Sequence, residues 1–122
     1  MTGGGPFRNI VLDGPVPPAL LGELAAGHRG AIKVVADIAT GAVAAGGEWH
    51  TDCLALLKAR GSNPADCWGA KLNIETGAIV YKSQINQNRP DNRLDEIADE
   101  GVRGAVKGLI DRYFRDALDH VD

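Results

Sequence analysis

Two copies of one short turn signal constrain this chain more than any other feature. The segments Asp37–Val43 and Asn73–Ile79 share the order Asp or Asn, Ile, any residue, Thr, Gly, Ala and an aliphatic residue. Glycine accepts the positive φ of a tight turn, and a preceding Asp or Asn bonds to the following main-chain amides. Apolar residues alternate on both sides of each signal, as in half-buried strands. The sequence therefore predicts two antiparallel β-hairpins, and shared turn chemistry explains the likeness better than duplication.

The strands and helices follow from the spacing of apolar residues. We expect residues 31–38 to pair with 42–49, and residues 68–74 to pair with 78–85. Helices are expected over 18–26 and 52–60, with Thr51 or Asp52 as the cap of the second, and over a C-terminal segment capped by Asp99. The predicted fold is α+β in the order α-ββ-α-ββ-α. Three helices pack mainly on one face of an antiparallel sheet of about four strands from the two hairpins.

Length and composition set the class of protein. The chain has 122 residues, enough for one domain, which we place at 18–122 behind a Gly/Pro-rich N-terminal arm at 1–17, with residues 9–12 as a further short strand. The formal charge of −3 argues against a nucleic-acid partner. No apolar run approaches the roughly 20 residues of a membrane helix, and no signal peptide is evident. Cys53 and Cys67 are interpreted as reduced, buried thiols, which favours the cytoplasm.

The densest polar cluster lies at the end of the predicted second strand. On a strand, Glu48 and His50 point to one face, which we expect to be the apolar face of Ile32 and Val34. With Asp52 they are suitable metal ligands or acid/base groups. The structural alternative is that Asp52 caps a helix, His50 satisfies a buried main-chain group and Glu48 pairs with an arginine. Chemistry alone favours the structural alternative.

A second polar cluster surrounds Pro90 and contains Asn86 and Arg89. Arginine suits carboxylate or phosphate, but an ordinary polar loop is the somewhat better explanation of these residues. A pair between Glu48 and either Arg89 or Arg93 would unite the two clusters. Trp68 is expected in the core, and the glycine after it lets a ligand or another main-chain segment approach closely.

Residues spread over roughly 18–115 carry a resemblance to a known family. They are Val34 to Ile38, Gly46, Gly47, Glu48, His50, Asp52, Leu56, Leu57, Gly61, Ser62, Asp66, Trp68, Gly69, Ile85, Asn86, Arg89, Pro90, Asn92, Asp99, Val102 and Arg103. In this order they resemble an uncharacterised microbial family, the domain of unknown function 5674. The chain departs from it by a one-residue insertion before Arg89 and by Trp49, where the family commonly has Leu. The resemblance supplies no function, but it centres on Glu48, His50, Asp52, Trp68, Asn86 and Arg89. It therefore makes one shared pocket an equal alternative to a purely structural network of these residues.

Two classes of function remain open at this point. The first is a small ligand-binding or regulatory protein with a polar pocket around Glu48, His50 and Arg89. The second is a hydrolase-like enzyme, with or without a metal, that uses Glu48 or His50 as acid/base. A weaker third is an interaction module, because Val35, Val43, Ala45 and Trp49 would share a sheet face. If no helix covers that face, we expect a homodimer. Ligand, metal and cofactor are not specified by the sequence.

Overall fold

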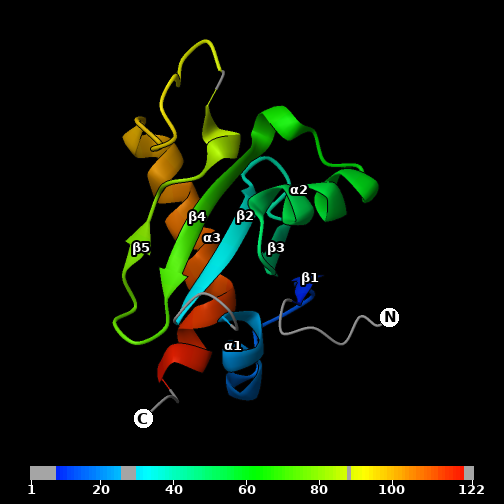
Figure 1. Ribbon diagram of the computed structural model, residues 1–122, viewed down its shortest axis with the longest axis vertical. Coiled ribbons are helices and arrows are strands. Elements are labelled where there is room, and N and C mark those ends of the chain that lie inside the picture. Colours follow the sequence, from blue (N-terminus) through cyan, green and yellow to red (C-terminus); the bar gives the residue numbers. More distant parts are fainter. Residues whose placement is uncertain (1–7, 26–29, 88, 120–122) are drawn as a thin grey trace.

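The computed structural model describes residues 8–25, 30–87 and 89–119. The elements are β1 (Asn9–Val11), α1 (Pro18–Ala25), β2 (Ala31–Asp37), β3 (Val43–Gly46), α2 (His50–Ala59), η1 (Pro64–Asp66), β4 (Cys67–Asn73), β5 (Ile79–Val80), η2 (Gln84–Asn86) and α3 (Glu100–Asp119), as Figure 1 shows. The strands form one antiparallel sheet in the order β1-β3-β2-β4-β5. The predicted α+β class, with three α-helices and two hairpins, is confirmed. The sheet described here has five strands rather than about four, because β1 joins it beside β3.

The two hairpin turns have the same construction. The Asp37 carboxylate accepts hydrogen bonds from the main-chain amides of Ala39 and Thr40 at 2.9 and 3.1 Å. The side-chain oxygen of Asn73 accepts the equivalent bonds from Glu75 and Thr76 at 2.8 and 3.0 Å. Gly41 and Gly77 follow with φ values of 85° and 76°. These turns therefore confirm the local chemistry that the sequence signal predicts.

The second strand of each hairpin is shorter than predicted. β3 ends at Gly46, since Gly46 and Gly47 have φ values of 95° and 78° and turn the chain away from the sheet. A Cβ atom on Gly46 would lie 2.0 Å from the Arg8 carbonyl oxygen, so this close approach requires glycine. β5 covers only Ile79–Val80 before the chain turns into η2. The predicted strands at 42–49 and 78–85 were therefore too long.

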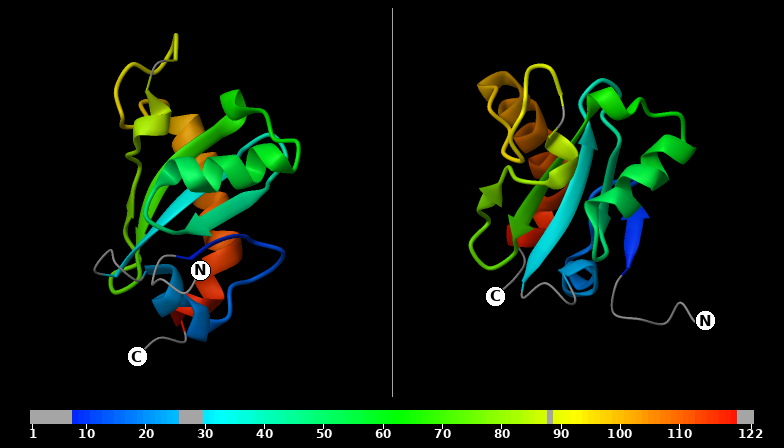
Figure 2. Two further views of the ribbon diagram at one scale, coloured as in Figure 1. Left: turned by 45° about the vertical axis from the view of Figure 1, so that its right-hand side comes forward. Right: turned by 45° about the horizontal axis from the view of Figure 1, so that its top comes forward.

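Helices cover both faces of the sheet. Figure 2 shows α3 behind the strands and α2 on the opposite side. The face with α1 and α3 holds the larger core, which includes Ile32, Val34 and Val43. The face with α2 holds a smaller core around Val35 and Ala44. Two of the three helices thus share one face, as predicted, and the third does not.

The predicted grouping of residues on the sheet faces was wrong in the first hairpin. Val35 pairs with Ala44, so Val43 and Ala45 lie on the opposite face from Val35. Val35 and Val43 are both fully buried, the former near α2 and the latter in the larger core. The exposed apolar face on which we based a homodimer is therefore not present in the described part of the chain.

Part of the predicted N-terminal arm belongs to the core. Leu12 and Val16 of the arm are buried in the larger core, while residues 1–7 lie outside the described residues.

Asp99 caps α3, since its carboxylate accepts a hydrogen bond from the Val102 amide at 3.1 Å. Within the described residues, no helix combines the length and the apolar character needed to cross a membrane.

α2 covers only part of its face of the sheet. It packs on the part that carries Val35 and Ala44, and Figure 1 shows the lower ends of β2 and β4 extending beyond it. Lys33 of β2 and Lys71 of β4 lie on this uncovered part and are half-buried. The fold thus places two lysines beside the N-terminus of a helix.

Candidate functional site

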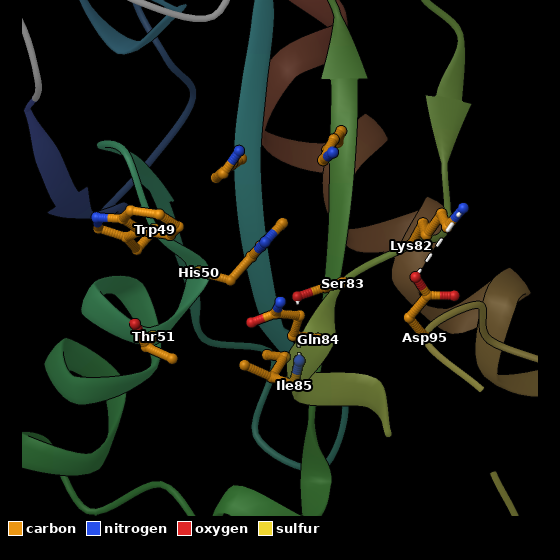
Figure 3. Close-up of a pocket in the computed structure, with 10 residues that line it drawn as sticks. Trp49, His50, Thr51, Lys82, Ser83, Gln84, Ile85 and Asp95 are labelled. Carbon is orange, nitrogen blue, oxygen red and sulfur yellow. Dashed lines mark hydrogen bonds and ion pairs between the residues drawn. The ribbon is translucent and has the colours of Figure 1, made fainter. Parts of the chain in front are cut away.

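A cavity of about 330 Å³ opens between the N-terminus of α2, the sheet and the segment that follows β5. Figure 3 shows Trp49 and Thr51 on one side of it and Lys82 with Asp95 on the other, with His50, Ser83, Gln84 and Ile85 between them. We call this cavity the lysine pocket. Its lining residues are Lys33, Trp49, His50, Thr51, Lys71, Lys82, Ser83, Gln84, Ile85 and Asp95.

The central feature of the lysine pocket is a pair of like charges. Lys33 and Lys71 stand directly opposite each other on β2 and β4. Like charges in this position destabilise a sheet. Burial lowers the pKa of Lys33, and the positive charge of Lys71 lowers it further, while the carboxylate of Glu48 acts in the opposite direction. The pocket therefore holds positive charge that the fold does not fully neutralise.

The N-terminus of α2 adds to the positive potential. The helix begins at His50, and its N-cap residue is Trp49, whose side chain makes no capping hydrogen bond. The capping role predicted for Thr51 or Asp52 was therefore wrong. The N-terminus of a helix is the positive end of its dipole. Because His50 and Thr51 line the pocket, this end of the helix faces it.

The close approach of Ser83 to the sheet depends on Gly69. A Cβ atom on Gly69 would lie 2.5 Å from the Ser83 Cβ atom and 3.1 Å from the His50 ring. The glycine after Trp68 thus admits another segment of the chain, one of the two possibilities that the sequence left open. It brings the segment after β5 next to α2 and closes one side of the lysine pocket.

His50 is held by the sheet. Its side chain is 8% exposed, and its Nε2 atom lies 2.8 Å from the Ala70 carbonyl oxygen. A carbonyl oxygen only accepts hydrogen bonds, so Nε2 carries a hydrogen and donates it. This bond satisfies a buried main-chain group, as in the structural alternative for His50. It also fixes the ring at the wall of the pocket.

Glu48 and Asp52 do not join His50 in one ligand set. Glu48 lies in the loop after β3, and Asp52 is exposed in the first turn of α2. The prediction that Glu48 and His50 share a strand face was wrong, because Gly46 and Gly47 end the strand before them. Among the residues that the structure describes, no three or more His, Cys, Asp or Glu side chains are arranged to hold a metal ion.

Trp68 and Arg89 line a separate hollow of about 430 Å³. The Arg89 guanidinium lies over the Trp68 ring, 3.8 Å from its centre. It donates hydrogen bonds to the carbonyl oxygens of Ala65, at 2.7 Å, and of Cys67. No ion pair joins Glu48 to Arg89 or Arg93 in the described part of the chain, and Arg89 binds main-chain carbonyl groups instead.

A comparison with protein families bears on these residues. The family model described as "Protein of unknown function (DUF5674)" matches residues 10–113. The chain belongs to the DUF5674 family. The resemblance stated from the sequence is thereby confirmed. No curated protein matches the chain, and no solved structure matches it.

Asn86 has a structural position in this DUF5674 protein. Its side chain is fully buried, accepts a hydrogen bond from the Gly69 amide at 2.8 Å and donates one to the Gly69 carbonyl oxygen at 3.0 Å. It also donates to the Asp95 carbonyl oxygen at 3.0 Å. Beyond the end of β5, this amide group thus takes the place of a strand residue opposite Gly69.

The predicted site residues of this DUF5674 protein are therefore divided. Of these six, His50 lines the lysine pocket, Trp68 and Arg89 line the second hollow, and Glu48, Asp52 and Asn86 line neither. Ile85 lines both cavities, so they are neighbours. Sequence reasoning missed Lys33, Lys71, Lys82, Ser83 and Gln84. The available signal was a lysine within each of two mainly apolar strands, Lys33 in β2 and Lys71 in β4.

Proposed function

We propose that this protein binds a small anionic ligand in the lysine pocket through a phosphate or carboxylate group. The observation that carries the proposal is the direct pairing of Lys33 with Lys71 inside a cavity. This is a ligand-binding function of the kind expected from the sequence, with the pocket built from the sheet lysines and His50 rather than around Arg89.

The charges near the two lysines support the proposal. Lys82 of the same pocket has Asp95 at 3.9 Å. Within the described residues, no ion pair includes Lys33 or Lys71. Glu48 raises the pKa of Lys33, but this effect is smaller than the opposing effects of burial and of Lys71. An anion between the two ammonium groups would remove a repulsion that the fold leaves in place.

The neighbouring groups suit the same ligand. Main-chain amides at a helix N-terminus bind phosphate and carboxylate readily. The hydroxyl group of Thr51 and the amide group of Gln84 are exposed in the lining and are able to donate hydrogen bonds to anionic oxygens. The positive end of α2 and the lysine pair thus lie on two walls of one cavity and favour the same charge.

Calorimetric titration tests the proposal with inorganic phosphate, pyrophosphate and citrate as probes. We expect at least one of them to bind the wild-type protein, and Lys33→Gln and Lys71→Gln each to weaken its binding about tenfold or more. Lys58→Gln is the matched control, because Lys58 lies exposed in the last turn of α2, outside the pocket. Equal affinity in the wild type and both pocket variants would exclude the lysine pair as the site.

We also propose a cytoplasmic location and a homodimer. We assign no surface of the protein as the dimer interface. Cys53 and Cys67 are both free and buried, which is consistent with a reducing compartment. Cell fractionation tests the location. Light scattering at high micromolar concentration tests the dimer, and a mass of one chain would exclude it.

A further inference from the structure

We infer that the ligand of the lysine pocket is a phosphorylated compound with a planar ring, of the size of a nucleoside monophosphate, and that its ring stacks on Trp49. The inference rests on the proposed function, since the lysines are taken to hold the phosphate. It adds the chemical class of the ligand and the residue that selects it.

Trp49 is the first observation. Its side chain is 59% exposed, although it lines the cavity at the start of α2. Tryptophan is usually highly buried, so an exposed indole at the rim of a cavity indicates a surface for stacking. Figure 3 shows the indole at the side of the pocket next to Thr51, across from Lys82 and Asp95.

The main chain at Trp49 is held in place. The next residue, His50, is anchored to the Ala70 carbonyl oxygen at 2.8 Å, and α2 begins there. Trp49 itself has an extended conformation with φ −129° and ψ 137°. Stacking on a ring carried by a fixed main chain requires ordering of the side-chain torsions only, which favours binding.

The second tryptophan of the chain provides an internal comparison. Trp68 is 6% exposed, and the guanidinium of Arg89 already covers its ring at 3.8 Å. Trp68 thus has a planar partner from the protein itself. Trp49 has a comparable ring at the pocket rim, and its exposed surface is available to a planar group from a ligand.

The size and the remaining polar groups define the ligand further. A cavity of about 330 Å³ lies at the lower end of the range for ligand sites, which fits one nucleotide rather than two. The exposed amide group of Gln84 offers a donor and an acceptor to the edge of a ring. The net charge of −3 disfavours a long nucleic acid in the same place.

The test compares adenosine 5′-monophosphate, guanosine 5′-monophosphate and cytidine 5′-monophosphate with ribose 5-phosphate, by calorimetry on the full chain. Because base stacking on an aromatic side chain is worth about 5- to 150-fold in affinity, at least one nucleotide should bind that much more tightly than ribose 5-phosphate. Trp49→Leu should abolish this difference and leave the affinity for ribose 5-phosphate unchanged. Trp49→Phe, which keeps a ring, should retain most of the difference. A melting curve confirms that each variant is folded.

The outcomes separate the two proposals. If ribose 5-phosphate and all three nucleotides bind the wild type equally, the stacking inference is wrong and the proposed anion site stands. If the nucleotides bind more tightly but Trp49→Leu preserves the difference, the ring contacts another residue and the inference is again wrong. If neither these probes nor the inorganic anions bind, both proposals fail.

Discussion

Replacing Lys71 with glutamine is expected to stabilise the fold while it weakens anion binding. Lys71 faces Lys33 across β2 and β4, and both side chains are half-buried. A like-charge pair in this position costs roughly 0.2–1 kcal/mol of stability. Because both side chains are partly exposed and salt screens their charges, we expect a cost in the lower half of this range. We therefore expect Lys71→Gln to raise the free energy of unfolding by about 0.3–0.5 kcal/mol at low salt.

The dependence on pH follows from the direction of the Lys33 shift. The pKa of Lys33 is lowered in the folded protein from its ordinary value of 10.5, chiefly by burial and then by Lys71. Between the folded and unfolded values, the unfolded chain binds more protons, so stability rises with pH. The penalty is complete below the folded pKa and disappears above 10.5. The gain from Lys71→Gln should therefore be largest near neutral pH and shrink in alkaline solution.

Urea unfolding followed by circular dichroism at low salt measures this gain, and thermal melting provides a second reading of about 1–3 °C. Added phosphate or pyrophosphate should raise the melting temperature of the wild type more than that of Lys71→Gln. Lys58→Gln should respond as the wild type does. A loss of more than about 1 kcal/mol in Lys71→Gln without anion would refute the reasoning, since it would make the lysine a structural residue.

Three further predictions concern Asn86, Gly69 and the two cysteines. Asn86→Ala should lower the free energy of unfolding by about 2–4 kcal/mol in urea, because three hydrogen bonds to main-chain groups are lost, two of them buried; an unchanged midpoint would contradict the structural role. Gly69→Ala should destabilise by about 1–3 kcal/mol, because its Cβ would lie 2.5 Å from that of Ser83, whereas Gly104→Ala on α3 has open space and should stabilise by about 1 kcal/mol. Burial raises the pKa of Cys53 to about 12 and of Cys67 to about 11, so a thiol reagent at pH 8 should react slowly with the native protein and rapidly in denaturant.

The hairpins could be predicted from the sequence because their information is local. Asp37 and Gly41, like Asn73 and Gly77, contact each other within five consecutive residues, and the turn forms from those contacts alone. The same holds for the start of α3, where Asp99 caps an amide three residues away. Features of this kind depend on neighbours along the chain and not on how distant segments pack.

The assignment of His50 failed because a strand pattern was extended through two glycines. Alternation across Gly46 and Gly47 placed Glu48 and His50 on one face, but both glycines have positive φ, so the alternation ends there. The reason for that conformation is distant in sequence, since the main chain at Arg8 approaches Gly46 too closely for any side chain. A pair of glycines between an apolar run and a helix is better interpreted as the end of a strand.

The lysine pocket could not be predicted, because its central contact is set by the pairing of two hairpins. Lys33 and Lys71 are placed opposite each other only by the register of β2 on β4, and no local signal specifies that register. The same pairing places Gly69 opposite Val35, where the absence of a side chain leaves room for Ser83 and for the ring of His50. One register thus sets both the incompletely neutralised lysine pair and the wall that encloses it. A variant that preserved both lysines but shifted the register would separate them, so the proposed anion site depends on the sheet rather than on any motif.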